Sequence, residues 1–160
     1  EIFTAFTPSF LATPANRATP STQDGVELWL AARIAAQWQI DAHWTNMHAV
    51  ESSPPVQEIG RPPNSASINL VWRAGNNRFG ANLTLRYQSQ SRDFQFTPAG
   101  ALRAAMAERL LANIAADYRL NETWSVYGRI ENVFGTPYEE SFSFPAPGRA
   151  AYLGVRAAWP

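Results

Sequence analysis

The chain has 160 residues, which is the size of one ordinary domain. Its 13 basic and 13 acidic residues give a formal net charge of zero, and this argues against a nucleic-acid partner because phosphate binding requires a basic excess. Cysteine is absent, so disulfides and thiolate metal sites are excluded, and the charged fraction of 16% lies well below the roughly 25% of ordinary soluble domains.

The hydropathy pattern contains no segment that approaches the roughly 18 to 20 apolar residues of a membrane-spanning helix. No basic region followed by an apolar stretch opens the sequence, as a signal peptide would require. The chain is therefore either soluble or enters a membrane as β-strands. An aromatic fraction of 12%, with six Trp, favours a surface that partly faces lipid.

Repeated alternation of apolar and polar residues predicts an all-β fold with about eight strands. The clearest example places Val26, Leu28 and Leu30 on one face. In chain order, the predicted strands cover Ile2–Phe10, Val26–Ile34, Trp38–Thr45, Ser67–Arg73, Phe79–Gln88, Leu110–Arg119, Trp124–Glu131 and Ala151–Trp159.

Short and long connections alternate between these strands. The short ones lie at Ala36–Gln37, Gly75–Asn77 and Asn121–Thr123, and the long ones at about Leu11–Asp24, Val50–Asn64, Ser91–Ala107 and Gly135–Gly148. Transmembrane β-barrels show this alternation because tight turns face the periplasm and long loops face outside. The pattern predicts antiparallel transmembrane β-barrel strands in an up-and-down meander.

The Ala-rich segment Ala99–Ala116 is ambiguous, because Ala, Leu, Glu and Arg also favour helix. A short helix within Gly100–Glu108 is the competing interpretation. From Arg109 onward the two-residue period resumes and indicates a strand.

The two faces of the predicted strands suit lipid on one side and a wet interior on the other, since a sheet in lipid must close on itself. Charges of both signs are mixed on the polar faces and can pair between strands. Tryptophans that lie mostly near strand ends indicate aromatic girdles, and ordinary core tryptophans are the alternative. These are Trp29, Trp38, Trp44, Trp72, Trp124 and Trp159.

The C-terminal quarter carries a family pattern. Asn132-Val133-Phe134, then Tyr138-Glu139 and Pro147-Gly148-Arg149 before the last strand, closely resemble the C-terminal end of TonB-dependent outer-membrane receptors. Asp24–Arg33 and Gly60–Arg73 resemble further strands of that family, so the resemblance covers nearly the whole chain. Within the family, the sequence most resembles vitamin B12 (cobalamin) receptors, with siderophore receptors close behind.

The resemblance implies a location in the bacterial outer membrane and a role in importing scarce iron chelates or cobalamin. Family members have a 22-stranded barrel filled by an N-terminal plug, and TonB drives import through a short N-terminal box. About eight strands are predicted here, with no plug and no TonB box, so residues 1–160 look like the C-terminal portion of such a barrel, as a single domain or a fragment. The implied partners are outer-membrane lipid, the rest of the barrel and plug in the same or another chain, and TonB through the missing N-terminal part.

The long outer loops are the candidate substrate-binding regions, because recognition commonly lies on loops carried by a rigid scaffold. They offer charged and aromatic side chains, and solvated loops without a ligand role are the alternative. The candidates are Arg61, Arg92, Asp93, Phe94, Tyr138 and Phe142.

The titratable residues do not indicate catalysis or a metal. His43 and His48 lie five residues apart on one predicted strand and point to opposite faces, which disfavours a shared metal. Glu139 and Glu140 belong to a predicted loop motif, and no GxSxG elbow is present. We expect no cofactor, no metal and no enzymatic activity.

Two further hypotheses remain beside a receptor fragment. One is a self-contained eight-stranded outer-membrane barrel with a structural or binding role, in which Ile2–Phe10 closes onto the last strand and both termini lie at the periplasmic side. The other is a soluble β domain. The strand count and the edges of the sheet distinguish them.

Overall fold

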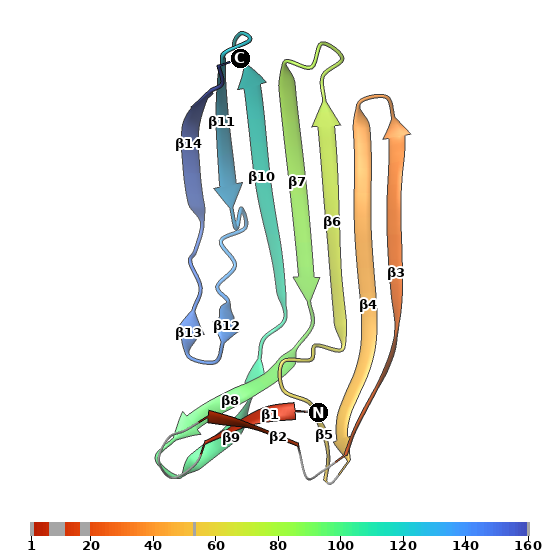
Figure 1. Cartoon of the computed structure of the whole chain (residues 1–160), viewed down its shortest axis with the longest axis vertical. Coiled ribbons are helices and arrows are strands. Elements are labelled where there is room, and N and C mark those ends of the chain that lie inside the picture. The colour runs from red at the N-terminus through yellow and green to blue at the C-terminus, as the bar shows by residue number, and fades with distance from the viewer. Residues whose placement is uncertain (1, 7–11, 17–19, 53, 160) are drawn as a thin grey trace.

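The computed structural model describes residues 2–6, 12–16, 20–52 and 54–159, and within these ranges the chain is all-β. A single curved layer of strands dominates the molecule (Figure 1). Within the described part of the chain, no helix has the length and apolar character needed to cross a membrane.

Seven long strands form this layer, and each is antiparallel to its neighbours. A short eighth strand, β5 (Pro55–Gln57), pairs with one of them. In spatial order the seven are β14 (Ala150–Ala157), β11 (Trp124–Glu131), β10 (Arg109–Arg119), β7 (Phe79–Gln88), β6 (Asn64–Arg73), β4 (Trp38–Ser52) and β3 (Ser21–Ala35). The predicted meander is confirmed, and the register is regular over most of its length.

The three predicted short turns lie together at one end of the sheet, at the top in Figure 1. Asparagine shapes two of them. Asn77 has a φ of 56° and its N–H donates to the Ala74 carbonyl at 2.8 Å. In the other turn, the Asn121 side-chain oxygen accepts from the N–H groups of Thr123 and Trp124. Asparagine tolerates the left-handed region and mimics a backbone turn, which explains both positions.

The long connections lie at the opposite end of the sheet, where three short hairpins also lie. These are β1 (Ile2–Phe6) with β2 (Ala12–Asn16), β8 (Ser91–Thr97) with β9 (Gly100–Met106), and β12 (Glu139–Ser141) with β13 (Phe144–Pro145). The short helix considered within Gly100–Glu108 is therefore wrong over residues 100–106. Pairing with β8 outweighs the helix propensity of its alanines, because propensity is a weak preference.

The first predicted strand, Ile2–Phe10, is not a wall strand. Residues 2–6 pair with Ala12–Asn16 in a separate hairpin at the long-connection end, and residues 7–10 lie outside the described ranges. Among the described residues β14 pairs only with β11, so the closure of the first strand onto the last that the self-contained barrel requires is not formed there. The first strand therefore starts at the long-connection end, whereas the chain ends at the short-turn end.

The sheet has seven wall strands, and this odd number determines the relative direction of its two edge strands. β3 and β14 are separated by six antiparallel steps, so they run in the same direction. They cannot pair with each other antiparallel. Among the described residues the sheet is open, with β3 at one edge and β14 at the other.

The register places apolar side chains in continuous rows on one face. One row joins Leu30, Ala42, Ile68, Leu85 and Ala112, and the next joins Ala32, Ile40, Leu70, Leu83, Ile114 and Ile130. Within residues 20–52 and 54–159, the buried apolar residues are Ala49, Met106 and Ala112, whereas Leu28 is 60% and Leu153 is 87% exposed. Among the residues that the structure describes, no second protein layer packs against the apolar face of the sheet.

Candidate functional site

The apolar face is bounded at both ends by aromatic side chains. At the short-turn end, the Trp72 ring lies 6.1 Å from Trp38 and 5.5 Å from Phe79, and Trp124 meets Trp159 edge to face. At the other end, Trp44 and Tyr87 share a row through Ala66. The two sets are separated by roughly 20 to 27 Å along the strands. This is the scale of the about 25 Å apolar band, flanked by aromatic girdles, of outer-membrane barrels.

Trp29 is an exception to the predicted girdle. It pairs with His43 in a row of the polar face, with the two rings 6.2 Å apart, and it is 68% exposed at the middle of β3. Its residue type predicted a place in the girdle. The two-residue period of β3 already placed Trp29 on the other face of the strand from Leu28 and Leu30.

The middle of the polar face is held by uncharged side chains. Asn82 donates to the Asn69 side-chain oxygen at 2.7 Å, and the Thr84 hydroxyl lies 3.1 Å from both asparagine oxygens. These three half-buried residues link β6 to β7 beyond the backbone ladder. The polar face is therefore held by side-chain hydrogen bonds as well as by the backbone hydrogen bonds between the strands.

Charged and aromatic groups gather on the polar face near the short turns. In one row Arg73, Gly80, Asp117, Tyr127 and Gly154 lie side by side on five neighbouring strands. The two glycines make room: an added Cβ at Gly80 would meet Asp117 at 2.6 Å, and one at Gly154 would meet the Tyr127 ring at 2.4 Å. Arg73 and Asp117 pair across Gly80 at 3.4 Å.

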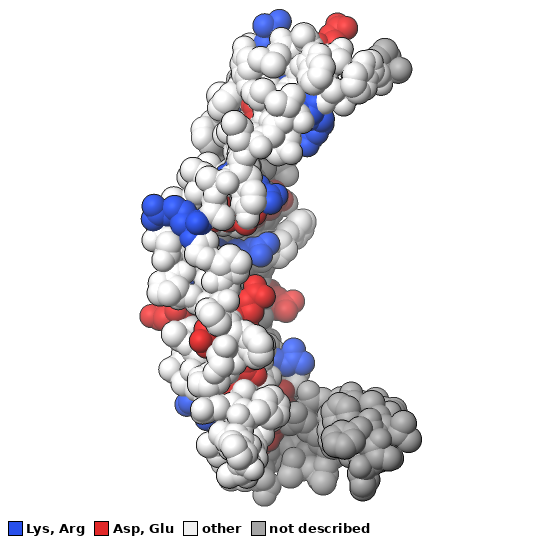
Figure 2. Space-filling model, turned by 90° about the vertical axis from the view of Figure 1, so that its left-hand side faces the viewer, with Lys and Arg blue, Asp and Glu red and all other residues white. Residues whose placement is uncertain are grey.

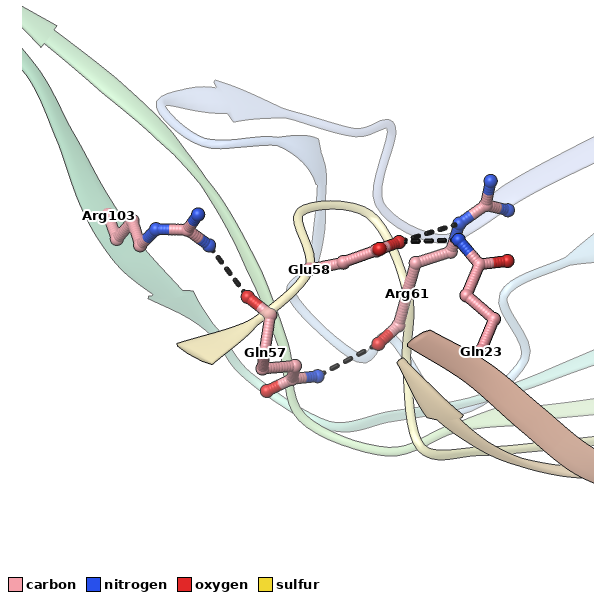
Figure 3. A network of polar contacts seen from close by, with 5 residues as sticks. All are labelled: Gln23, Gln57, Glu58, Arg61 and Arg103. Carbon is pink, nitrogen blue, oxygen red and sulfur yellow. Dashed lines mark hydrogen bonds and ion pairs between the residues drawn. The ribbon is translucent and has the colours of Figure 1, made fainter. Parts of the chain in front are cut away.

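A polar network ties together the long connections at the other end (Figure 3). Glu58 is 2% exposed, and its Oε2 accepts from Gln23 at 2.6 Å and lies 3.9 Å from the Arg61 Nε. Gln57 donates to the Arg61 carbonyl at 2.8 Å. Arg103 on β9 donates to the Gln57 carbonyl at 2.6 Å and to Glu51 at 2.7 Å. The network therefore joins β3, the segment after β5, and the β8–β9 hairpin.

Backbone and side-chain bonds extend this network to the last long connection. The Gly60 N–H donates to the Arg92 carbonyl at 2.9 Å. The Asp93 carboxylate accepts from the Phe142 N–H at 2.7 Å and from the Phe94 N–H at 2.8 Å. Arg61, Arg92, Asp93 and Phe142, predicted separately as substrate-binding residues, are thus brought into one connected region.

The remaining two predicted residues lie beside that region. The Phe94 ring packs on Phe96 at 6.0 Å. Tyr138 lies under the Arg109 guanidinium, whose carbon is 5.1 Å from the ring centroid, and Arg109 also donates to the Glu139 carbonyl. Each of the six predicted residues has a contact in the structure, and the contact of Tyr138 is with Arg109 at the start of β10. Their role toward a ligand stays a prediction.

Asn132 is a structural residue whose role the sequence did not reveal. It is 4% exposed, has a φ of 49°, and exchanges two hydrogen bonds with the Thr136 backbone, at 2.9 and 3.0 Å. Its own N–H donates to the Asn113 side chain at 2.9 Å. Asn132 therefore ends β11 and sets the start of the last long connection, which gives the Asn-Val-Phe motif a physical basis.

The described residues contain no group of three or more His, Cys, Asp or Glu side chains that could hold a metal ion. His48 lies 3.4 Å from Asp24, and His43 lies on the opposite face of β4 beside Trp29, as predicted.

The chain resembles several solved structures in its fold. No protein-family model and no curated protein matches the chain. The Pseudomonas aeruginosa FpvA receptor, solved with pyoverdine and iron, matches 98% of this chain and 23% of its own length, with a TM-score of 0.75 and 15% identity. The Escherichia coli ferric-catecholate import receptor Fiu matches 86% of this chain and 21% of its own, with a TM-score of 0.70 and 18% identity. The sheet has the fold of a TonB-dependent receptor barrel.

The copper transporter OprC shares this receptor fold, with a TM-score of 0.68 and 17% identity over 99% of this chain and 26% of its own. The chain spans about a quarter of the receptors that it matches. The resemblance drawn from the C-terminal motifs is confirmed for the fold. FpvA and Fiu are receptors, and OprC is a copper transporter.

Proposed function

We propose that the chain forms part of the wall of a TonB-dependent transporter in the bacterial outer membrane, and that this transporter imports a scarce nutrient. We favour an iron–siderophore complex over cobalamin as this nutrient. The solved proteins described above are described with pyoverdine, ferric catecholate or copper as the substance that they bind or transport. Cobalamin as the nutrient is supported by the sequence resemblance alone.

The observation that carries the proposal is the pair of parallel edges. Since β3 and β14 run the same way, an all-antiparallel barrel needs an odd number of further strands between them. Two copies of this chain with the same orientation in a membrane would again place parallel edges together. A 22-stranded transporter barrel leaves 15 strands after these seven are subtracted (22 − 7 = 15), which is odd.

The self-contained barrel and the soluble domain are less consistent with the sheet. A closed eight-stranded barrel needs an eighth wall strand, whereas β5 has three residues and β1 pairs with β2. A soluble domain needs a second layer against its apolar face. In a receptor wall, lipid covers that face and the unpaired edges meet further barrel strands.

The proposal assigns roles to the partners. Lipid contacts the apolar face, the remaining barrel strands pair with β3 and β14, a plug fills the polar side, and TonB acts through the plug. The outer network around Glu58 and Asp93 holds the loops that present Arg61, Arg92, Phe94 and Tyr138 toward a nutrient. No chemistry is assigned to these loops beyond binding.

Uptake measurements test this function. The gene is disrupted in its host, and uptake is measured for iron-labelled pyoverdine, an iron-labelled catecholate siderophore, labelled copper and labelled cobalamin. We expect uptake of one probe to fall at least about tenfold, and to fall equally when TonB is lost. Unchanged uptake of all four probes, or uptake that does not depend on TonB, would contradict the proposal.

A further inference from the structure

The polar face becomes strongly basic in its last three rows before the short turns, which we call the basic rows. The register joins Arg33 to Tyr152 in the first of them, Arg73 to Gly154 in the second and Arg119 to Arg156 in the third. In the described wall strands, Asp117 is the acidic residue of these rows. The basic residues are Arg33, Arg73, Arg119, Arg129 and Arg156.

The next three rows, toward the long connections, have a different charge balance. Glu27, Asp41 and Glu131 lie there with Arg86 and Arg109 as the basic residues of the described strands. Figure 2, seen from the β14 side, shows basic side chains in the upper half, toward the short turns, and acidic ones gathered near the middle. Mixed signs are sufficient for charges to pair between strands. The separation of basic charge to one end of the face therefore calls for another explanation.

Most of the positive charge in the basic rows is available to a ligand. Two of the five arginines pair with acidic residues, at 3.4 and 3.2 Å. Among the described residues Arg33, Arg119 and Arg156 form no ion pair, and all three are exposed. Arg119 and Arg156 flank Ser125 in one row, which places like charges on either side of β11. The basic rows therefore keep net positive charge.

Aromatic rings hold two of the arginines beside an open hollow. Arg73, Arg129 and Arg156 line this hollow of about 310 Å³ together with Tyr127. The Arg156 guanidinium lies 5.4 Å from the Tyr127 centroid, and that of Arg129 lies 4.4 Å from the Tyr152 centroid. A guanidinium held on an aromatic face keeps N–H donors available for anionic oxygen atoms. The hollow therefore has the chemistry of a binding site for a ligand with anionic oxygens.

The place of these rows in a barrel decides which ligand meets them. Lipid covers the other face of the wall, so an imported molecule crosses the barrel on the polar side and meets the basic rows last, because tight turns face the periplasm. Arginines that line a pore favour anions, and an apolar surround strengthens their field. The arginines extend from β6 to β14 over roughly 19 Å, so an anion can bind them in steps and also leave.

We propose that the basic rows form a cationic exit for the nutrient, and that the nutrient is an anionic iron chelate. The siderophore oxygens of such a chelate carry more negative charge than the ferric ion neutralises. Arg156 and Arg119 bind these oxygens in turn after the outer loops have released the chelate. The inference rests on the proposed function and deepens it, because it adds the charge of the nutrient and a part of the wall that acts in transit.

Uptake kinetics test the inference, because a transit site affects the rate of import and not the binding at the outer loops. The full-length protein that contains this chain is expressed in its host and supplied with iron-labelled pyoverdine or an iron-labelled catecholate siderophore. We expect Arg119→Glu combined with Arg156→Glu to lower the maximal uptake rate of the imported probe at least about fivefold. The dissociation constant for surface binding, measured in cells that lack TonB, should stay the same. Arg156→Lys should keep most of the rate.

Arg78→Glu is the matched control, because it makes the same change of charge in the neighbouring short turn, outside the basic rows. It should leave the uptake rate unchanged. Resistance to unfolding in unheated detergent reports whether each variant forms its barrel, and where the double variant does not, Arg156→Gln should still lower the rate by about half. An unchanged rate, equal losses in Arg156→Lys and Arg156→Glu, or surface binding that weakens as much as uptake would overturn the inference.

The charge of the imported molecule separates this inference from the proposed function. The electrophoretic mobility of the imported iron probe at neutral pH gives the sign of its charge, and we expect it to migrate as an anion. TonB-dependent import of copper or cobalamin alone, or of a neutral or cationic iron chelate, overturns the inference and leaves the proposed function intact. Absence of any TonB-dependent uptake contradicts the proposed function itself.

Discussion

Arg73 on β6 and Asp117 on β10 form an ion pair across the strand between them, with the Arg73 Nη1 and Asp117 Oδ2 atoms 3.4 Å apart. The pair passes over Gly80 of β7, where an added Cβ would lie 2.6 Å from the Asp117 carboxylate and 2.8 Å from the Arg73 guanidinium. Gly80 lies on the middle one of these three strands, and its lack of a side chain allows the ion pair to form.

Replacement of Gly80 by Leu should separate this pair and crowd the row. We expect Gly80→Leu to lower the unfolding free energy of the lipid-embedded protein by about 1 to 3 kcal/mol, the usual cost of overpacking. Urea titration monitored by tryptophan fluorescence measures it. Gly148→Ala is the control, since a Cβ there meets nothing within 4 Å, and it should change stability by less than about 0.5 kcal/mol. Equal stability of the two variants would contradict the proposed crowding.

The apolar face should reject charge. Leu83 lies in the row with Leu70 and Ile114, so Leu83→Arg should destabilise the membrane-embedded state by about 2 to 4 kcal/mol. Ala31→Arg, on the polar face beside Asp41, should be tolerated within about 0.5 kcal/mol. Folding titrations into lipid vesicles compare the two. Equal costs would mean that lipid does not cover the Leu83 face.

Two tryptophans should report opposite environments. Trp44 shares a row with Leu28 on the apolar face, whereas Trp29 shares a row with His43 on the polar face. In membranes of brominated lipid, Trp44→Phe should remove a strongly quenched emission component, and Trp29→Phe a weakly quenched one. The reverse result would invert the assignment of the two faces.

Asn132 should stabilise the last long connection. Asn132→Ala removes two hydrogen bonds to Thr136 and forces alanine to a φ of 49°, so we expect a loss of about 1 to 3 kcal/mol. Asn132→Gly keeps the backbone conformation, and it should therefore lose less. Hydrogen exchange of the Thr136 amide, which donates to Asn132, should accelerate in both variants. An unchanged exchange rate would contradict this role.

Asp93 should hold two loops together. Asp93→Ala removes the acceptor of the Phe142 N–H, so segment 137–147 should become more susceptible to added protease. Glu140→Ala, at an exposed position of the same connection, is the control and should leave the cleavage rate unchanged. The measurement is limited proteolysis of intact cells or outer membranes, with fragments identified by mass. Unchanged cleavage of Asp93→Ala would show that the loops are held by other contacts.

The local alternation of apolar and polar residues was sufficient to predict the wall strands. It was not sufficient to predict the hairpins outside the wall. Phe79–Gln88 and Trp124–Glu131 match the predicted bounds, because a strand with one apolar face repeats every two residues. Ile2–Phe6 shows a similar pattern but pairs with Ala12–Asn16. A two-residue period indicates a strand and does not name its partner.

The sequence predicted the candidate binding residues from their residue types and their positions in long connections. It did not predict which residues they contact. Arg61 and Asp93 were identified because they are charged residues of long connections. The hydrogen bond from Gln23 to the buried Glu58 joins residues 35 positions apart, and the bond from the Phe142 N–H to Asp93 joins residues 49 positions apart. Both depend on segments that are distant in the sequence and fold against each other. Asn132 was identified as part of a motif, and only its φ, its burial and its bonds to Thr136 show that it ends β11 and orders the next connection.

The sequence by itself determined the all-β fold, the two faces and the alternation of turns and loops, since each follows from side chains within one strand or one turn. Tertiary structure decided the number of wall strands, the parallel direction of β3 and β14, and the meeting of Arg73, Arg129 and Arg156 around one hollow. These depend on which strands pair and in which register. Register relates residues that lie far apart in the chain, and no local pattern encodes it.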